Sequence, residues 1–600
     1  MHQPIVAQPE GLSAAASLPA WNLGDLYASP QDPQITRDLQ AAEAAAVAFE
    51  AQYKTCLAGL TGADLAGAVQ AYERLEEALG RVISYAQLLF SADSSDPAQG
   101  KFYQTMSERV TDISTHLVFF TLELNRIDEP VLAAQLQHPA LARYAPWLRD
   151  LRVFLPHQLS DEIETLLHEK EVTGHAAWSR LFDETTTAMR IAFNGEELTL
   201  SAALNKLSDP NREVRRQAGK AVGQAMASQE KLFSLITNTL AKDKEVIDRW
   251  RKYPTPGSYR NRSNMVEDEV VAALSTSVQG AYGRLSHRYY AMKAKWLGLE
   301  RLEYWDRNAP LPEDADEGIG WAQARSRVLA AYEGFSPELA AILQPFFDNN
   351  WIDATLRPGK AGGAFAHPTV PSAHPYVLLN YHGRTRDVMT LAHELGHGAH
   401  QVLAGAQGYL MSGTPLTLAE TASVFGEMLT FRALLDAETN QQRRRVMLAQ
   451  KVEDMLNTVV RQIAFYQFET RIHAERREGE LLPERIGEIW LEVQRESLGP
   501  AFHFDDEYRL FWAYVPHFIH SPFYVYAYAF GDCLVNALYG VYQAQADKPA
   551  FARKYVEMLK AGGTLRHGPL LAPFGLDARQ PDFWAKGLEV IAGFIDELDA

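Results

Sequence analysis

The stretch VMTLAHELGHGAHQVL, residues 388–403, contains the pattern HExxH at His393, Glu394 and His397. It has no proline, and its apolar residues recur at helical spacing, so the stretch predicts a helix. Residues four apart lie one above the other on the same helical face, which brings the two imidazoles together. Two such imidazoles can bind one Zn²⁺, and the glutamate between them can take a proton from water. The pattern therefore predicts a zinc site for peptide-bond hydrolysis, with Glu394 as the general base.

The third metal ligand must come from outside this helix. An HExxHxxGxxH site would need glycine at position 400 and histidine at position 403, but the chain has His400 and Leu403. A second helical stretch, TLAETASVFGEML at residues 417–429, follows a short turn and supplies Glu420. We expect Glu420 to complete the ligand set of one Zn²⁺ per chain. Glu427 shares the face of Glu420, so one carboxylate could bind the metal while the other steadies a ligand imidazole.

Composition and charge limit the classes of function. The 600 residues are 47% hydrophobic and 22% charged, as in globular proteins with more than one subdomain. The net charge of −18 argues against a nucleic-acid partner, because phosphates bind to basic surfaces.

Targeting signals and cysteines bear on the location of the chain. No stretch has the roughly 20 apolar residues that span a bilayer. Residues 1–22 lack the basic start and apolar core of a signal peptide. The sparse cysteines, Cys56 and Cys533, suit a reducing compartment. We expect a cytoplasmic protein without a membrane partner, and the sequence does not predict its oligomeric state.

Helical patterns dominate the rest of the chain, so the expected fold class is mainly α. The expected helical runs lie near residues 34–60, 63–92, 97–126, 129–150, 159–171, 174–190, 210–250, 267–298 and 316–346. Asn194-Gly195 predicts a two-residue hairpin turn between short strands. We place a soft boundary near 195–205, which gives a helical N-terminal region at 1–200 and a helical catalytic region at 201–600.

Residues 359–383, GKAGGAFAHPTVPSAHPYVLLNYHG, are rich in glycine and proline instead. Gly362 and Gly363 would let the backbone of a ligand approach closely. The residues from Tyr376 to Tyr381 predict a short strand directly before the HExxH helix. A strand with a free edge can pair with an extended peptide. The candidate substrate-binding residues are therefore Gly362, Gly363, Tyr376, Val377 and Leu378, and the alternative is a buried strand with an ordinary loop.

A second chemical cluster lies at residues 512–531, WAYVPHFIHSPFYVYAYAFG. Ser521-Pro522 predicts a helix start, which would place two histidines in the preceding loop and two tyrosines on one helical face. A phenol or imidazole near the zinc could donate a hydrogen bond to the oxyanion of a tetrahedral intermediate. An aromatic core helix is the alternative. The four candidates are His517, His520, Tyr524 and Tyr528.

Together these residues resemble the oligoendopeptidase F branch of the thimet-oligopeptidase family of zinc metallopeptidases. The matching segments follow the family's order along most of the chain: WNLGDLY (21–27), GKAGGAF (359–365), HPYVLLNY (374–381), LAHELGHGAHQ (391–401), ETASVFGE (420–427) and HFIHSPFYVYAYAFG (517–531). The resemblance implies a two-lobed helical ellipsoid around a deep central channel, with a small β-sheet beside the zinc helix. It also implies endopeptidase action on short peptides.

The resemblance also assigns roles to residues. It implies zinc ligation by His393, His397 and Glu420, and general-base catalysis by Glu394. It places substrate- and oxyanion-binding groups within residues 517–528. The alternative is a related zinc carboxypeptidase or dipeptidyl carboxypeptidase, which would need a cation for the substrate's C-terminal carboxylate. A non-catalytic protein with a structural zinc ion would have no use for Glu394.

Overall fold

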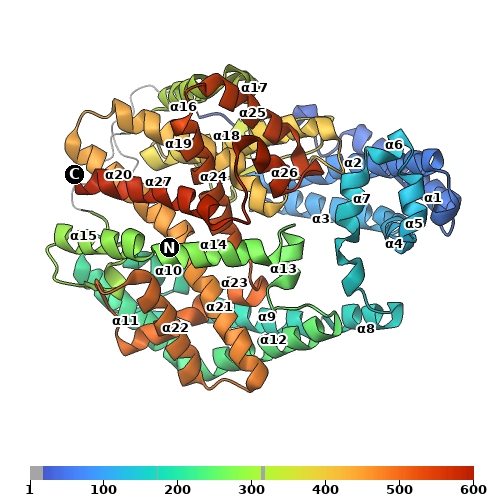
Figure 1. The fold of residues 1–600 in the computed structure, drawn as a ribbon. Coiled ribbons are helices and arrows are strands. Elements are labelled where there is room, and N and C mark those ends of the chain that lie inside the picture. The colour runs from blue at the N-terminus through green and yellow to red at the C-terminus, as the bar shows by residue number, and fades with distance from the viewer. Residues whose placement is uncertain (1–17, 172, 312–317) are drawn as a thin grey trace. The chain divides into compact units, whose positions relative to one another are not determined.

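The computed structural model describes residues 18–171, 173–311 and 318–600. We expect no signal peptide in residues 1–22, and most of this stretch, residues 1–17, lies outside the described residues. Residues 316–317, at the start of the helix expected at 316–346, lie outside them too. Within those ranges the fold is mainly helical, as predicted (Figure 1). Its short strands form three small sheets. None of the helices in the described part of the chain has an apolar run long enough to cross a bilayer.

The chain forms two compact units, and each unit is assembled from three separate segments. The first contains Met1–Val153, Asp316–Ala437 and Ala544–Phe574, and the second contains Phe154–Ala315, Glu438–Gln543 and Gly575–Ala600. Residues 154–200 thus pack with later helices, so the units do not follow the division at residue 200 that we expected. A boundary drawn along the sequence does not reveal that distant segments return to the same core.

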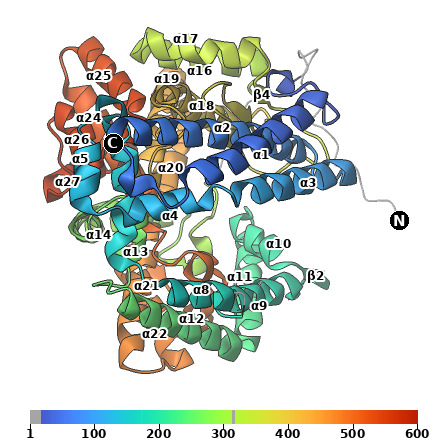
Figure 2. The same cartoon turned by 90° about the vertical axis from the view of Figure 1, so that its right-hand side faces the viewer.

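The first unit begins with a layer of long helices. Helices α1, α2 and α3 pack against one another, as Figure 2 shows. Thr61 caps the start of helix α2, and its side chain accepts a hydrogen bond from the Asp64 N–H. The helices of this unit are α1 (Pro33–Tyr53), α2 (Gly62–Ala92), α3 (Pro97–Ser114), α4 (Val118–Arg126), α5 (Glu129–Gln135), α6 (Pro139–Ala142), α7 (Ala145–Leu151), α16 (Trp321–Phe335), α17 (Pro337–Asp348), α18 (Thr385–Ala404), α19 (Leu416–Ala437), α25 (Lys548–Lys560) and α26 (His567–Leu571).

A three-stranded sheet in the first unit packs against α18, as predicted for the small sheet beside this helix. Its strands are β4 (Ile352–Asp353), β5 (Phe365–His367) and β6 (Tyr376–Leu378). Strand β6 lies in the middle, parallel to β4 and antiparallel to β5. Strand β5 therefore forms one edge of the sheet, and both β5 and β6 contact α18.

The second unit is also built mainly from helices. Asn194 and Gly195 connect its β1–β2 hairpin with φ values of 50° and 84°, which confirms the predicted turn. Its helices are α8 (Asp161–Glu171), α9 (His175–Ala188), α10 (Leu200–Asn205), α11 (Arg212–Ser228), α12 (Glu230–Trp250), α13 (Ser258–Ser263), α14 (Asp268–Ala281), α15 (Arg288–Trp296), α20 (Gln441–Thr458), α21 (Val460–Glu478), α22 (Pro483–Leu498), α23 (His517–His520), α24 (Tyr526–Ala544) and α27 (Pro581–Asp599). Its strands are β1 (Ile191–Phe193), β2 (Glu196–Leu198), β3 (Leu302–Glu303) and β7 (Phe502–His503).

Candidate active site

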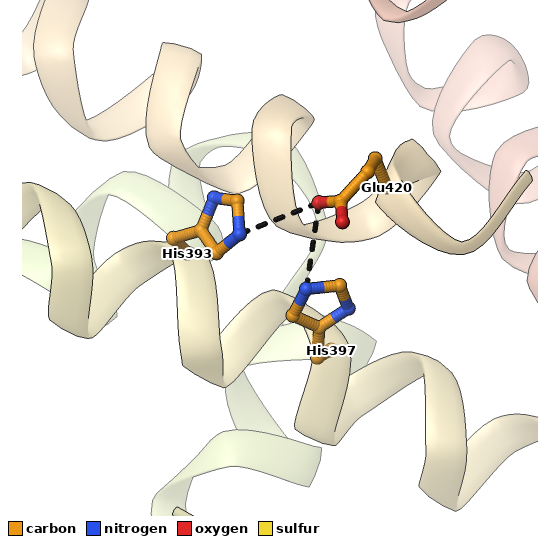
Figure 3. A group of neighbouring side chains, drawn as sticks. All are labelled: His393, His397 and Glu420. Atoms are coloured by element: carbon orange, nitrogen blue, oxygen red, sulfur yellow. Dashed lines mark ion pairs between the residues drawn. The ribbon is translucent and has the colours of Figure 1, made fainter. Parts of the chain in front are cut away.

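Helices α18 and α19 bring together the three predicted metal ligands. His393 and His397 project from successive turns of α18, and Glu420 faces them from α19 (Figure 3). The opposite side of α18 is anchored by buried apolar residues such as Leu391 and Leu395. This amphipathic division fixes which way the imidazoles point.

The spacing of the three side chains fits a tetrahedral metal ion. Nε2 of His393 lies 3.3 Å from Oε2 of Glu420, and Nε2 of His397 lies 3.4 Å from the same oxygen. Zinc bonds of about 2.0–2.2 Å at tetrahedral angles place ligand atoms roughly 3.3–3.5 Å apart. Two imidazole nitrogens with one carboxylate oxygen also form a known donor set of catalytic zinc. The residues present therefore fit Zn²⁺ in both chemistry and spacing.

A second group of potential ligands lies in the other unit. Glu303, His503 and Asp505 have donor atoms within 4.8 Å of one another. The His503 side chain is 51% exposed, and Asp505 also pairs with Lys220. The carboxylates of this group are thus engaged in ion pairs at an exposed site, so the HExxH group is the stronger candidate.

A glycine allows α18 and α19 to approach so closely. A Cβ atom on Gly396 would lie 2.4 Å from the Ala422 carbonyl oxygen and 2.6 Å from the Ser423 Cα. Contacts this short do not occur with real side chains, so the two backbones meet at this point because position 396 has none. Sequence reasoning did not identify Gly396, although a glycine inside the HExxH stretch was a visible signal.

Two buried tyrosines hold backbone carbonyls beside the ligands. The Tyr332 hydroxyl donates to the Ala392 carbonyl at 2.8 Å, and the Tyr555 hydroxyl donates to the Thr421 carbonyl at 2.7 Å. Ala392 precedes His393, and Thr421 follows Glu420. These tyrosines come from α16 and α25, so the sequence near the motif gave no sign of them.

Glu427 lies where it can orient a ligand imidazole. Its Oε2 is 3.1 Å from Nδ1 of His393, on the side of the ring opposite Glu420. Burial by itself lowers the pKa of the His393 imidazole. Hydrogen bonds and charge from Glu420 and Glu427 outweigh this effect and raise the pKa to about 10. Burial raises the pKa of Glu420, but both histidines pull it well below its usual value. A metal ion binding here would displace the imidazole proton, which makes metal affinity depend on pH.

Glu394 is almost fully buried between α18 and β5. Burial raises the pKa of its carboxyl group, and His393, His397 and a backbone hydrogen bond from Ala366 counteract this only in part. The Ala366 carbonyl accepts from the Gln401 side chain at 3.2 Å. The outer edge of β5 therefore lies directly beside the candidate base. Its raised pKa suits a group that accepts a proton near neutral pH.

The structure contradicts one part of the predicted substrate site. Tyr376, Val377 and Leu378 form β6, which is buried and paired on both edges, so an extended peptide has no free edge there. The Tyr376 hydroxyl instead donates to the Asn22 carbonyl within the core. The sequence predicted the strand correctly, but its two partners lie elsewhere in the chain.

The two glycines of this region lie in an exposed loop. Gly362 and Gly363 are exposed, and a Cβ atom at either position would meet open space. Gly363 has a φ of 78°, which favours glycine. The Asn380 side chain donates to the carbonyls of Ala361 and Gly363 at 3.0 and 3.1 Å and fixes the loop.

The predicted histidine and tyrosine cluster forms only in part, within the second unit. His517 Nε2 lies 3.3 Å from the Tyr528 hydroxyl, and the Tyr524 and Tyr528 rings are 5.3 Å apart. His520 turns away and contacts Asp183 of α9 at 2.8 Å. Helix α24 starts at Tyr526 rather than after Ser521, so Tyr524 precedes the helix. The left-handed conformation of Phe523, with φ 60°, interrupts the helix that Ser521-Pro522 predicted.

Comparisons with known proteins identify the family of the chain. The sequence profile of Peptidase family M3 matches residues 338–590, and the profile described as Oligopeptidase F matches residues 123–191. The chain belongs to peptidase family M3. This M3 peptidase is similar to oligopeptidase PepF of Bacillus subtilis, with 28% identity over 96% of this chain and 86% of the relative.

Solved structures share the fold of this M3 peptidase. Oligoendopeptidase F of Enterococcus faecium superimposes with a TM-score of 0.68 at 21% identity, covering 94% of this chain and 97% of the other. A protein of Chlamydophila abortus superimposes with a TM-score of 0.86 at 22% identity, covering 96% and 97%. The chain thus has the helical fold of oligoendopeptidase F. The family profiles and the similarity to oligopeptidase PepF identify it as an oligopeptidase, which acts on peptides.

Proposed function

We propose that this M3 peptidase is a zinc-dependent oligoendopeptidase, which cuts internal bonds of short unstructured peptides. The observation that carries the proposal is the tetrahedral spacing of His393, His397 and Glu420, with Glu394 one residue from the first ligand. A structural zinc site has no need for a buried carboxylate beside the metal. The ligand set, its spacing and this carboxylate together support hydrolytic use.

Glu394 acts as the proton carrier in the proposed mechanism. A bound Zn²⁺ supplies a Lewis acid that polarises the scissile carbonyl and lowers the pKa of water to about 7. Glu394 takes the proton from the attacking water and then delivers it to the leaving nitrogen. Glu427 keeps the Nδ1 proton of His393 engaged, so that Nε2 of this imidazole presents its lone pair to the metal position.

The peptide would bind along the loop that leads into β5. Gly362 and Gly363 offer exposed backbone there, and Ala366 of β5 contacts Glu394. A substrate backbone that hydrogen-bonds to this loop would bring a carbonyl towards the base. The side chains of the enzyme near Gly362 would not obstruct the substrate backbone. This suits an enzyme that accepts peptides of varied sequence.

His517, Tyr524 and Tyr528 are proposed to bind the substrate carbonyl and its oxyanion. Tyr528 is 37% exposed, and its hydroxyl lies 3.3 Å from Nε2 of His517. Burial and the charges of Arg461 and His520 lower the pKa of His517, which favours the neutral imidazole. His520 is left out of this proposal because it binds Asp183.

Blocked peptides test the proposal against its alternative. A library of peptides acetylated at the N-terminus and amidated at the C-terminus is digested by the zinc-loaded enzyme, with and without a chelator, and the products are identified by mass spectrometry. An oligoendopeptidase cuts these peptides in mid-chain, and the chelator abolishes cleavage. Cleavage only of peptides with a free C-terminal carboxylate would instead identify a carboxypeptidase or dipeptidyl carboxypeptidase.

The deep channel that the family resemblance implies would set a further limit on substrates. One cleavable sequence is presented first as a free peptide of roughly ten residues and then as a loop within a stable folded host. We expect the free peptide to be cut and the host loop to survive, because a folded domain is too wide to reach zinc at a channel floor. Equal rates would contradict an enclosed site.

A further inference from the structure

A tight turn connects the histidines of the aromatic cluster to its tyrosines, and its third residue is unusual. The Tyr524 N–H donates to the Ser521 carbonyl at 3.1 Å, so these four residues form a β-turn. Pro522 occupies the second position of the turn, and Phe523, with a φ of 60°, occupies the third. A type II turn has a positive φ at this position and normally places glycine or asparagine there. A phenylalanine is strained in this conformation, so the surrounding structure must hold it.

The peptide group between Pro522 and Phe523 is held at both ends. The Phe523 N–H donates to Oε1 of Glu469 at 2.8 Å. The Pro522 carbonyl accepts from Nε of Arg260, more weakly, at 3.4 Å. Type I and type II turns differ mainly in the orientation of this one peptide group. The two contacts therefore favour the orientation that gives Phe523 its positive φ.

Helix α21 supplies the stronger of these contacts and also holds the Phe523 side chain. Glu469 is 2% exposed, and the bond to Phe523 is the one hydrogen bond that its carboxyl group makes among the described residues. Its other oxygen, Oε2, is buried and has no hydrogen-bond partner within the same ranges. The Phe523 ring lies 6.0 Å from the ring of Tyr466 and 4.9 Å from that of His473, which are three and four residues from Glu469. One face of α21 thus clamps both the backbone and the ring of Phe523.

The turn determines where the rings of the aromatic cluster lie. A right-handed helical conformation at Phe523 would start the helix earlier, whereas the observed turn delays the start of α24 to Tyr526. The Tyr524 ring then stacks on the His517 ring, with their centroids 6.1 Å apart, and lies 5.3 Å from the ring of Tyr528. The clamped residue is therefore adjacent in the chain to one of these tyrosines and about one helical turn from the other.

We propose that Glu469 is a positioning residue for peptide hydrolysis, because by fixing the turn at Phe523 it sets the positions of Tyr524 and Tyr528. This inference rests on the proposed role of these tyrosines at the substrate carbonyl and its oxyanion. Glu469 itself is buried under the turn and acts only through it. Loss of its acceptor should therefore slow the chemical step. Zinc binding should not change, because the proposed zinc ligands belong to the first unit and Glu469 to the second.

Exchange of Glu469 for side chains of similar size tests the positioning role. Glu469→Met removes the acceptor, whereas Glu469→Gln keeps an oxygen for the Phe523 N–H. We expect Glu469→Met to lower kcat on a blocked peptide by about 10–100-fold, with KM and zinc content unchanged, because small displacements of catalytic groups have effects of this size. Glu469→Gln should keep kcat within a few fold of the wild type at neutral pH. Glu478→Met, at the exposed end of the same helix, is the control and should have normal kinetics.

A double variant separates this inference from the proposed function. If Glu469 acts through Tyr528, then Glu469→Met should slow Tyr528→Phe little further, although it slows the wild type. Normal kcat in Glu469→Met beside a slow Tyr528→Phe would overturn the positioning role alone. So would fully additive losses, or equal losses in Glu469→Met and Glu469→Gln. Normal kcat in both Tyr528→Phe and Tyr524→Phe would instead refute the proposed role of the cluster, and this inference would fall with it.

The other end of the peptide group provides a second variant, in case Glu469→Met does not fold. Arg260→Met releases the Pro522 carbonyl from a half-buried position. It should lower kcat in the same direction as Glu469→Met, by a smaller factor because the contact is longer. Its effect should also disappear in the Tyr528→Phe background. An unchanged kcat in Arg260→Met, or a loss that persists undiminished in Tyr528→Phe, would count against the turn as the device that positions the tyrosines.

Discussion

Nδ1 of His393 lies 3.1 Å from Oε2 of Glu427, while Nε2 of the same ring faces Glu420 at 3.3 Å. The two ring nitrogens thus have different partners, and each partner is a carboxylate from α19. In the proposed metal site, the carboxylate at Nδ1 would fix the tautomer and the ring orientation, and the one at Nε2 would share the metal position. One helix would therefore supply both a proposed ligand and the group that orients another.

Glu427→Gln should weaken metal binding without abolishing it. Glutamine keeps the size of the side chain but loses the charge that orients His393, and a loss of this kind typically costs about 10–100-fold in metal affinity or activity. Zinc content after dialysis against graded chelator measures the effect. Glu420→Ala is the matched comparison and should lose the metal altogether. Normal zinc content in Glu420→Ala, with loss in Glu427→Gln, would reverse the two roles.

Gly396→Ala should push α18 away from α19 and loosen the metal site. The added Cβ would lie 2.4 Å from the Ala422 carbonyl oxygen, so the backbones must separate. Overpacking of this kind costs about 1–3 kcal/mol of stability, and the shift also lengthens the distance from Glu420 to both imidazoles. Zinc affinity and the unfolding midpoint should both fall. Gly405→Ala at the end of the same helix is the control, because its Cβ would meet Pro371 only at 3.9 Å.

Glu394→Gln should keep the metal and lose turnover. Glutamine has the shape of glutamate but cannot accept a proton, so the general-base contribution of on the order of 10²–10⁴ in rate is lost. Metal analysis and peptide hydrolysis are measured on the same preparation. Near-normal hydrolysis by a fully zinc-loaded Glu394→Gln enzyme would rule out the proposed mechanism.

Local sequence patterns predicted the helices and the strand of the site better than they predicted which other segments pack against them. The HExxH spacing placed two imidazoles on one helical face, and the second helix with Glu420 followed after a short turn, so both elements were visible in the sequence. The strand at Tyr376 was also predicted, but its central position depends on pairing with residues 352–353 and 365–367. Hydrophobic periodicity reveals a strand but does not reveal which edges are covered.

Long-range contacts explain the remaining differences. His517 and His520 are three residues apart, yet only His520 binds Asp183, which is 337 residues away in the chain. Gly396 matters because α19 crosses it, and Tyr332 matters because its hydroxyl reaches the Ala392 carbonyl. These roles arise from packing between distant segments, which no local spacing encodes.

Glu469→Gln should change how stability depends on pH. Burial raises the pKa of Glu469 from 4.5 to about 8, against the opposing effects of the Phe523 N–H and the charges of Arg260 and Lys244. His473, also on α21, is partly buried, and desolvation lowers its pKa to about 3, so it stays neutral across this range. The folded state then holds a proton on Glu469 that the unfolded chain releases above its ordinary pKa. Stability therefore falls as pH rises from about 4.5 to about 8 and levels off above it.

Glutamine at position 469 cannot titrate, and its amide oxygen can still accept the Phe523 N–H. The unfolding midpoint of Glu469→Gln minus that of the wild type should therefore increase from about pH 5 to about pH 8. Glu478→Gln, an exposed position on the same helix, serves as the control and should give a flat difference. A flat difference for Glu469→Gln as well would mean that this carboxyl group does not carry the pH dependence.

Tyr528→Phe and His520→Ala should separate the catalytic part of the aromatic cluster from its structural part. Tyr528 is exposed and its hydroxyl contacts His517 at 3.3 Å, whereas His520 is held by Asp183. If the phenol donates to the oxyanion, Tyr528→Phe should lower kcat by about 10²–10³ with little change in KM, because the bond forms fully only in the transition state.

His520→Ala should instead lower the unfolding midpoint slightly and leave kcat within a few fold. Steady-state kinetics on one blocked peptide decides between them, with zinc content checked for each variant. A large loss of kcat in His520→Ala, with Tyr528→Phe unaffected, would place the oxyanion donor on the histidine that the structure turns away.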